Sequence, residues 1–473
     1  MSQVVALARD PYARIGPECL VRNARLAGVT LVANRSRRQR NNTNGAQGSA
    51  IPASGAVIRQ LGMFWRSPAL WSALVFAAGG VGFAAGNLLL ARVLPEEEYG
   101  RVALFLGLVQ IGIVVGPIGM DTVINRHHLG ASSWLLGRVS FTSAAVGVVL
   151  ALVAWCFYGF DAALAGVLAL TSFSAAVNRV AGALFQSRSK FGFSLFLILI
   201  HNWIVLVAVP VVLLYRRVAL PVAFTVAIGY VTMAVLGWRK GFQARHAAGT
   251  PATPAVPART LWQEAFAAVG LQVAVGAFFQ LDRLLIPHAL SIRDLAVYAV
   301  VSSIAASPFR MLQTGLGFAM LPRLKAAENR AAIHRLIRHE AVVAAVISAA
   351  AAIAVLVLTP WVLSAVLDNR YAFSGSLLHA LIVVGFVRVW GALAGAVVSA
   401  LGTARQLAML NVYSWLALGI ATIGAFVARD FELTGVVYGM GAGWLAAALA
   451  ATSIGWRAVK VRELSDVPRR SMN

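Results

Sequence analysis

Residues 264–323 read EAFAAVGLQVAVGAFFQLDRLLIPHALSIRDLAVYAVVSSIAASPFRMLQTGLGFAMLPR, and this stretch decides how the rest of the sequence is interpreted. The polar segment SIRD divides two apolar runs, each longer than the roughly 20 residues that a helix needs to cross a bilayer. Asp282, Arg283 and Arg310 nevertheless lie inside these runs. A charge at membrane depth costs about 2.5–3.5 kcal/mol on insertion scales, so it normally faces a bundle interior or a water-filled cavity. The runs are therefore predicted to be membrane helices that border a polar pathway.

The composition of the whole chain agrees with a membrane protein. Its 473 residues are 59% hydrophobic and 12% charged, with a mean hydropathy of +0.77, which is far from a soluble globular composition. The formal net charge of +23 has two compatible interpretations, basic loops beside anionic lipid or an anionic cargo. The basic residues are scattered over many loops, so a nucleic-acid partner is not expected.

Twelve apolar runs follow one another, and their lengths predict helices, since a β-barrel would show segments of about ten alternating residues. The predicted fold is an all-α polytopic membrane protein of about twelve transmembrane helices in two six-helix lobes. The expected spans are 68–91, 102–125, 139–160, 162–187, 191–215, 218–237, 264–289, 295–320, 341–366, 375–402, 406–428 and 433–455.

The segments between and around the spans predict the domain organisation. A basic, low-complexity composition before the first span predicts a disordered tail, or a misassigned start with translation beginning at Met63. The expected divisions are a tail (1–66), an N-terminal lobe (67–237), a linker (238–263), a C-terminal lobe (264–456) and a second tail (457–473). Far more basic loop residues fall on one side of the predicted spans than on the other, which places both termini in the cytoplasm.

The two lobes also resemble each other. Residues 87–104 (NLLLARVLPEEEYGRVAL) align with residues 283–300 (RLLIPHALSIRDLAVYAV) at an offset of 196. Both segments contain an apolar run, a leucine (Leu94 and Leu290), an acidic residue (Glu98 and Asp294) and then a second apolar run. Parallel repeats of this kind are a transporter architecture.

The ends of the first two predicted helices carry a sequence pattern that resembles a known family. The first helix ends in an apolar-Ala-Arg-apolar-Leu sequence, a Pro-Glu-Glu-aromatic-Gly turn follows, and the second helix ends in a glycine pair and an arginine. The residues that carry this pattern are Ala91, Arg92, Leu94, Pro95, Glu96, Glu97, Tyr99, Gly100, Gly119 and Arg126, with Asp282, Tyr298 and Pro322 in the second lobe. Over residues 68–455 the chain resembles polysaccharide-biosynthesis flippases of the Wzx type, within the multidrug/oligosaccharidyl-lipid/polysaccharide (MOP) exporter superfamily.

The resemblance implies a MATE-like MOP exporter fold in a bacterial inner membrane. It implies a flippase that moves polyprenyl-pyrophosphate-linked oligosaccharide from the inner to the outer leaflet by alternating access, for exopolysaccharide, capsule or O-antigen synthesis. The implied partners are this lipid-linked saccharide, membrane lipid, and a glycan polymerase with export machinery. A multidrug or cation exporter of the same superfamily and a membrane glycan polymerase or ligase remain alternatives.

An anionic diphosphate cargo would require fixed cations in the membrane, because guanidinium groups bind phosphate oxygens in a bidentate manner and stay charged. Four arginines fall inside predicted spans: Arg179, Arg283, Arg310 and Arg388. We expect Arg388 near the midplane, Arg283 in the outer third, and Arg179 and Arg310 in the inner third, as a staggered ladder. Alternatively, Arg283 pairs with Asp282, and Arg179 and Arg310 extend to the cytoplasmic interface.

Other polar residues in the spans have less defined expected roles. Asp121 and Asp282 are candidates for ion coupling or for pairing with arginines. Asn87, Gln110, Gln280 and Gln313 are candidates for sugar contacts, although interhelical contacts would explain each of them. Pro308, two residues before Arg310, predicts a helix kink.

Motifs for chemistry are missing from the sequence. It has no phosphate-binding Gly-rich loop ending in Gly-Lys-Ser/Thr, no G-x-S-x-G and no H-E-x-x-H. Cys19 and Cys156 are its only cysteines. We therefore expect a transporter and not an enzyme, with no catalytic residue, metal or cofactor. The short loops expected outside the membrane argue against a polymerase or ligase.

Overall fold

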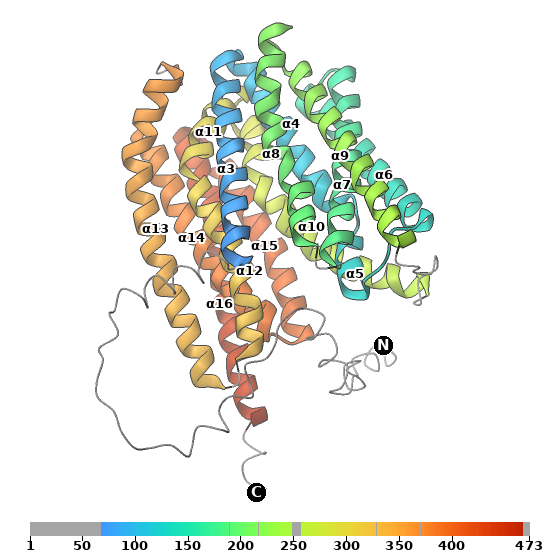
Figure 1. Ribbon diagram of the computed structural model, residues 1–473. Coiled ribbons are helices and arrows are strands. Elements are labelled where there is room, and N and C mark those ends of the chain that lie inside the picture. Colours follow the sequence, from blue (N-terminus) through green and yellow to red (C-terminus); the bar gives the residue numbers. More distant parts are fainter. Residues whose placement is uncertain are drawn as a thin grey trace, which may run out of the picture. The chain divides into compact units, whose positions relative to one another are not determined.

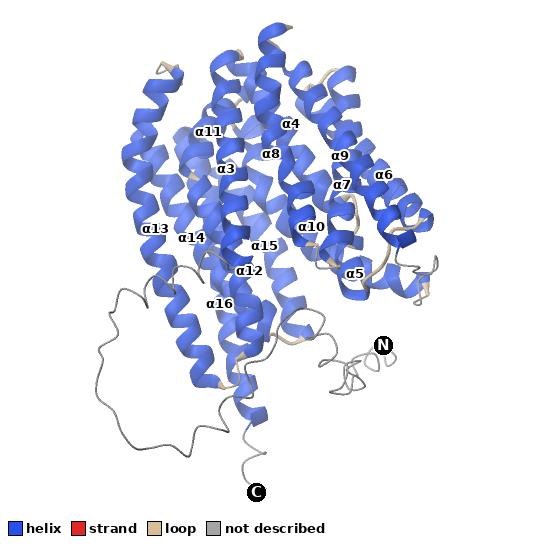
Figure 2. Cartoon of the chain, in the orientation of Figure 1, coloured by secondary structure: helices blue, strands red, loops and turns tan. Residues whose placement is uncertain are grey.

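The computed structural model describes residues 68–466, apart from 189, 216, 248–256, 328, 369 and 372, and over these residues the chain contains helices and no strand (Figures 1 and 2). They belong to one compact unit, Trp65–Asn473. The first seven helices are α3 (Pro68–Val93), α4 (Glu96–Val115), α5 (Met120–His127), α6 (Ser133–Tyr158), α7 (Ala162–Gln186), α8 (Phe191–Leu214) and α9 (Ala219–Ala247). The next seven are α10 (Ala258–Ala289), α11 (Ile292–Ala305), α12 (Ser307–Ala326), α13 (Arg330–Leu367), α14 (Gly375–Leu401), α15 (Ala404–Val427) and α16 (Glu432–Asp466), with the 3₁₀ turn η3 (Arg429–Phe431) before α16.

These helices confirm the predicted all-α polytopic fold. Among the described residues, nine helices are long and apolar enough to cross a membrane, and the bent pair α11 and α12 gives a tenth. The two other predicted spans, 68–91 and 264–289, lie within α3 and α10. Figure 1 shows α13 at one edge of the helix bundle and α6 at another, and both helices carry many exposed apolar side chains, as lipid-facing helices do.

Two predicted spans are not continuous helices. The run 102–125 is divided between α4 and α5 by a turn at which Ile118 and Gly119 have positive φ angles of 47° and 75°. The run 295–320 is divided at Ala306, where α11 and α12 meet at a bend of 57°. Pro308 lies in the first turn of α12, where its missing N–H needs no partner. The kink predicted from this proline is thus confirmed.

The helices also extend into segments that the sequence analysis assigned to loops. Within the predicted linker, residues 238–247 continue α9 and residues 258–263 begin α10, because the apolar periodicity ends before the helix does. Residues 457–466 of the predicted C-terminal tail likewise continue α16. The tail 1–66 and the middle of the linker, 248–256, lie outside the described residues. The division into two six-helix lobes stays a prediction.

The element boundaries strengthen the evidence for an internal repeat. The last residues of α3 and α10, Val93 and Ala289, are 196 residues apart, as are the first residues of α4 and α11. The first residues of α7 and α14, of α8 and α15, and of α9 and α16 are each 213 residues apart. The second repeat is thus longer between these two groups of helices, where the 38-residue α13 replaces the 26-residue α6. Contacts repeat as well, since α9 packs on α7 and α8 as α16 packs on α14 and α15.

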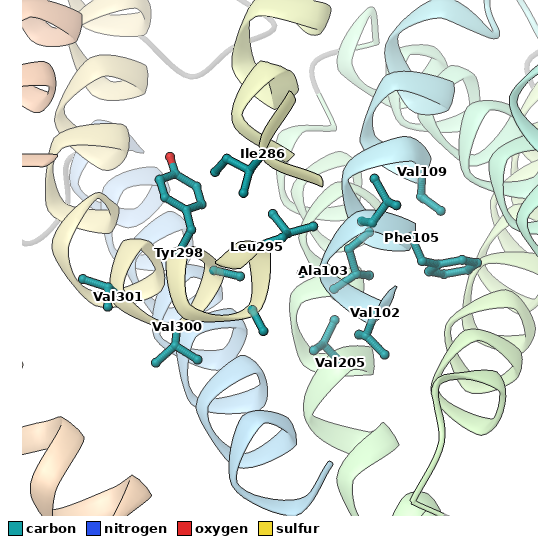
Figure 3. Packing of buried hydrophobic residues seen from close by; sticks show 14 of the residues in the cluster. Val102, Ala103, Phe105, Val109, Val205, Ile286, Leu295, Tyr298, Val300 and Val301 are labelled. Atoms are coloured by element: carbon teal, nitrogen blue, oxygen red, sulfur yellow. The ribbon is translucent and has the colours of Figure 1, made fainter. Parts of the chain in front are cut away.

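The two repeats meet mainly through α4, which packs against α10 and α11. Buried apolar residues from both repeats form one continuous cluster there. Figure 3 shows part of this cluster, where Ile286 of α10 and Leu295 of α11 face α4 residues such as Ala103. The largest hydrophobic core therefore lies between the repeats as well as inside them.

Gly100, in the acidic turn of the family pattern, sets how closely α4 and α11 approach. A Cβ atom at Gly100 would lie 2.3 Å from the Ile292 carbonyl oxygen, a backbone atom that cannot move aside. Gly137 in α6 has no atom within 4 Å of the corresponding position. The two glycines therefore form a matched pair for a substitution.

We expect Gly100→Ala to destabilise the protein by about 1–3 kcal/mol, because overpacking forces the two repeats apart. Thermal unfolding of the purified protein in detergent measures the effect as a lower midpoint. Gly137→Ala is the control and should not lower the midpoint, because the added Cβ meets no atom and alanine is the better helix former. Equal midpoints for both variants would contradict the close approach of α4 and α11.

Candidate functional site

A buried cluster of charged and polar side chains joins four helices of the second repeat. At its centre is Asp282 of α10, whose side chain is 1% exposed. The carboxylate Oδ2 accepts a hydrogen bond from the Tyr298 hydroxyl on α11. The same oxygen lies 3.4 Å from Arg310 Nη2 on α12 and 3.9 Å from Arg388 Nη2 on α14. We call Asp282, Tyr298, Arg310 and Arg388 the Asp282 cluster.

Local backbone features bring these side chains together. The break at Ala306 turns α12 away from α11, so that Tyr298 before the break and Arg310 after it reach the same carboxylate. Gly385, three residues before Arg388, allows α14 to approach α12, since a Cβ there would lie 2.6 Å from the Phe309 ring. The site thus depends on a bend and on a glycine contact, and not only on its charges.

Trp444 of α16 adds an aromatic face to the cluster. The Arg388 guanidinium carbon lies 4.6 Å from the centre of the Trp444 ring, a distance typical of a cation–π contact. Phe278 meets the same ring edge-on, with the ring centres 4.1 Å apart. The contact fixes the orientation of a side chain that is almost fully buried. Trp444 was not among the residues predicted for the site, although a tryptophan within a predicted span that also carries small residues was a possible signal.

Both guanidinium groups of the cluster have an unused hydrogen-bond donor. The Nε atoms of Arg310 and Arg388 are buried and have no hydrogen-bond partner. A cavity of about 10 Å³, room for one water molecule, lies beside Arg388, and its lining includes Tyr298, Phe309, Leu381, Val437 and Met440. Two cations face one carboxylate here, so the cluster carries an excess of positive charge.

The structure brings two of the four predicted arginines together. Arg310 and Arg388 approach the same carboxylate oxygen, Asp282 Oδ2. Their staggered depths in the membrane stay a prediction. Arg283 points away from the cluster, because its guanidinium donates to the Ala103 carbonyl on α4 at 3.4 Å, and only its backbone N–H donates to Asp282 Oδ1, at 2.9 Å. The alternative expectation was that Arg283 pairs with Asp282. In the structure the guanidinium groups near Asp282 are those of Arg310 and Arg388, and the Arg283 guanidinium contacts α4 instead.

Arg179 lies in the other repeat and has a carboxylate of its own. Its Nε is 2.8 Å from Asp121 Oδ2, which joins α7 to α5. The Asp121 side chain is 10% exposed and that of Arg179 is 35% exposed. Of the two roles left open for Asp121, the structure shows the pairing.

The four candidate sugar contacts are distributed over both repeats. Asn87 is buried, donates to the Phe83 carbonyl and accepts from the Tyr99 hydroxyl, which is an interhelical role. Gln110 lies 3.4 Å from His201 Nε2 in the first repeat. Gln280 is half-buried on α10. Gln313, one turn after Arg310, has a buried side-chain oxygen without a partner. Gln280 and Gln313 are thus the two candidates within three residues of a member of the Asp282 cluster.

Polar contacts also join the repeats toward both ends of α10. Near its start, Glu264 Oε2 lies 2.9 Å from His127 Nε2, and Gln272 donates to Thr122 at 2.8 Å. Beyond its end, Arg293 Nε lies 2.8 Å from Glu96 Oε2. The Asp282 cluster thus lies between two sets of contacts that hold the repeats together. Within the described part of the chain, no three His, Cys, Asp or Glu side chains are placed to hold a metal ion.

We expect Asp282→Asn to lower the thermal midpoint clearly, because it leaves two buried guanidinium groups without a counter-charge, a loss of about 3–5 kcal/mol for a broken buried pair. The matched control is Asp121→Asn, whose partner Arg179 is partly exposed and can be hydrated, so that the loss should be smaller. Thermal unfolding of both variants in the same detergent gives the comparison. A larger loss in Asp121→Asn would contradict the central place of Asp282.

Comparison with solved structures identifies the fold. An inward-facing multidrug resistance MATE family transporter of the MOP superfamily aligns with a TM-score of 0.61 and 15% identity, over 84% of this chain and 100% of that one. The lipid II flippase MurJ in an inward closed conformation aligns at 0.57 and 11%, over 83% and 87%. A MOP superfamily transporter from Pyrococcus furiosus aligns at 0.53 and 13%, over 82% and 94%. The fold is therefore that of the MOP superfamily, as predicted.

Comparison with curated proteins gave no match. The profile of the family described as polysaccharide biosynthesis protein matches residues 89–376, more than half of the chain. These residues include the acidic turn after α3, the Asp282 region and the bend between α11 and α12. Together with the fold, this match shows a multi-pass membrane protein that belongs to the polysaccharide biosynthesis protein family.

Proposed function

We propose that the protein is a flippase that moves a polyprenyl-pyrophosphate-linked oligosaccharide from the inner to the outer leaflet of a bacterial inner membrane. The observation that carries the proposal is the Asp282 cluster, in which Arg310 and Arg388 share one carboxylate and keep unpartnered Nε donors. Family membership links the chain to polysaccharide synthesis, and the fold is one that transporters use.

The chemistry of the cargo fits these guanidinium groups. A diphosphate diester carries two negative charges and several oxygens, and a guanidinium can bind two of these oxygens with parallel hydrogen bonds. Arg388 is held against an aromatic ring and Arg310 lies beside a helix bend. One group therefore has a fixed orientation and the other can follow the movement of α12, which suits a site that both binds and releases an anion.

Alternating access is the mechanism that we propose. The cavity beside the cluster has room for about one water molecule, so the helices must separate before a diphosphate can enter. Glu264–His127 and Glu96–Arg293 join the repeats on opposite sides of the cluster. Opening one set of contacts while the other set holds would expose the site to one side of the membrane at a time.

We also propose that both termini lie in the cytoplasm, together with the end of α10 that carries Glu264.

A multidrug or cation exporter is the alternative within the same fold. Such a cargo requires an acidic site, and Asp121 and Asp282 are both paired with arginines. The transporter from Pyrococcus furiosus shows that this fold accommodates other pockets, because its binding pocket has reverse polarity, which suggests a different function for that protein. The charge balance of the Asp282 cluster favours the anionic cargo. A glycan polymerase or ligase would be expected to carry a large loop outside the membrane, and the described connections on that side, such as those after α3, α6 and α10, are short.

The first test of the proposed function is a leaflet-exposure assay in proteoliposomes with a short polyprenyl-pyrophosphate saccharide. We expect transport by the wild type and a loss of tenfold or more in Arg388→Ala, since a hydrogen bond to a charged group contributes about 1.5–3 kcal/mol. Arg283→Ala tests the arginine that lies between the repeats. Arg101→Ala is the control, because this arginine pairs with Glu98 on the surface of α4.

Three outcomes distinguish the hypotheses. Loss in Arg388→Ala, with transport by the Arg101→Ala control, supports the cationic site. Transport that is retained in both Arg388→Ala and Arg283→Ala would leave a flippase with another cargo site. Wild-type protein that does not move the lipid-linked saccharide but exports cationic dyes would contradict the proposed function.

Membrane potential supplies a second prediction. Moving two negative charges outward across an inside-negative potential of about 100 mV releases about 4–5 kcal/mol. We therefore expect a potassium diffusion potential of this sign to accelerate outward exposure, and the opposite sign to slow it. The comparison requires vesicles with the same proportion of protein in each orientation. Exposure rates that do not change with the potential would show that a compensating charge crosses the membrane with the diphosphate.

A further inference from the structure

The Asp282 cluster contains an anion of its own, and its arginine contacts are longer than those of two close ion pairs elsewhere in the molecule. Asp121 and Arg179, and Glu96 and Arg293, are each 2.8 Å apart, as charge-assisted hydrogen bonds usually are. Asp282 Oδ2 instead lies 3.4 Å and 3.9 Å from the nearest nitrogens of Arg310 and Arg388. Neither arginine is bound by two parallel hydrogen bonds, so the carboxylate only partly uses the donors of the two guanidinium groups.

An incoming phosphate would compete with Asp282 for these donors. The Nη atoms of both arginines face the carboxylate, and their Nε atoms are buried without a partner. A phosphate group can engage Nε and Nη of one guanidinium at the same time. Such binding would satisfy the orphaned Nε donors and would take the Nη donors away from Asp282.

Asp282 would keep two hydrogen-bond donors after it loses its contacts with the guanidinium groups. Its Oδ2 still accepts from the Tyr298 hydroxyl, and its Oδ1 still accepts from the backbone N–H of Arg283 at 2.9 Å. Both remaining donors lie on α10 or α11. A carboxylate that keeps two hydrogen bonds can stay ionised and buried after it has been displaced, which makes the exchange of anions reversible.

The exchange also affects the bend between α11 and α12. Asp282 contacts Tyr298 before the break at Ala306 and Arg310 after it, and so it holds the two sides of the bend together. Release of Arg310 removes this connection while Tyr298 keeps α11 attached to α10. A ligand changes a conformational equilibrium only through contacts that differ between the states, and the transfer of Arg310 from carboxylate to phosphate is such a difference.

We propose that Asp282 is an internal counter-anion: it occupies Arg310 and Arg388 in the empty site, is displaced by the diphosphate of the cargo, and thereby frees α12 to move relative to α10 and α11. This inference rests on the proposed function, because it requires an anionic cargo at the same guanidinium groups. It adds a role for Asp282 as the group that couples cargo binding to the helix bend, and a role for Tyr298 as the donor that holds the displaced carboxylate.

The test compares inorganic pyrophosphate binding to full-length protein in detergent by titration calorimetry. Asp282→Asn removes the competing charge and should bind pyrophosphate more tightly, by on the order of tenfold, a usual size for coupling between two ligands. Asp121→Asn is the matched control and should bind as the wild type does, because Arg179 belongs to another pair. Tyr298→Phe should bind more weakly, since the displaced carboxylate loses its hydroxyl donor.

Hydrogen exchange provides a second readout that does not depend on the stability of one variant. In the wild type, pyrophosphate should increase amide exchange in the first turns of α12, residues 307–314, without a similar increase in α11. The Asp121→Asn variant should respond in the same way. In Asp282→Asn, the exchange of these turns should be high before pyrophosphate is added and should change little on its addition.

Failure of this inference is distinguishable from failure of the proposed function. If the wild type binds pyrophosphate but Asp282→Asn binds it equally or more weakly, Asp282 is not a competitor and the flippase proposal stands. If Asp282→Asn does not fold, unchanged binding in Tyr298→Phe together with unchanged exchange in wild-type α12 overturns the inference. If neither the wild type nor any variant binds pyrophosphate, the anion-binding site itself is wrong. That result overturns the inference and removes the observation that carries the proposed function.

Discussion

The burial of a carboxylate together with two guanidinium groups is the constraint on which the second repeat depends. Each isolated ion would lose several kcal/mol of hydration free energy on burial, so Asp282, Arg310 and Arg388 can be buried only in one another's presence. They come from three helices, and Tyr298 adds a fourth. The electrostatic requirement therefore fixes where α10, α11, α12 and α14 lie relative to each other, in a bilayer where apolar contacts alone give little preference between helix partners.

The two repeats have the same helix order and differ in charge. In the first repeat, Asp121 and Arg179 form a close pair with one charge of each sign. In the second repeat, one carboxylate faces two cations, with Trp444 against one of them. Corresponding helices of the two repeats begin 196 or 213 residues apart. The repeats differ in their buried charges and in the length of α13, which is longer than its counterpart α6. The architecture is thus shared by both repeats, and the positive site belongs to one of them.

The sequence was sufficient for the fold and for part of the site. Long apolar runs predict spans because each helix must satisfy its backbone hydrogen bonds internally, and the Pro308 kink followed from a missing donor. The positions of Arg283 and Arg310 could not be predicted in the same way. Adjacent residues on a helix point about 100° apart, so which of Asp282 and Arg283 faces the cluster depends on helix rotation, which packing against α4 determines. The place of Arg310 beside Asp282 depends on the 57° bend at Ala306. Pro308 indicates that a kink exists but does not define its angle.

In the proposed mechanism, the same bend would allow a small cavity to open for a large cargo. The space beside Arg388 is bordered by Phe309 and Gly385, so the distance between α12 and α14 determines its size. Because Arg310 is on α12 and Arg388 is on α14, separating these helices would also pull apart the two cations around Asp282. Repulsion between the cations favours this separation, and a shared anion opposes it. A carboxylate with one charge and a diphosphate with two would balance that repulsion differently. Under the proposed exchange of anions, the helix spacing, and with it the size of the site, would therefore depend on which anion is bound.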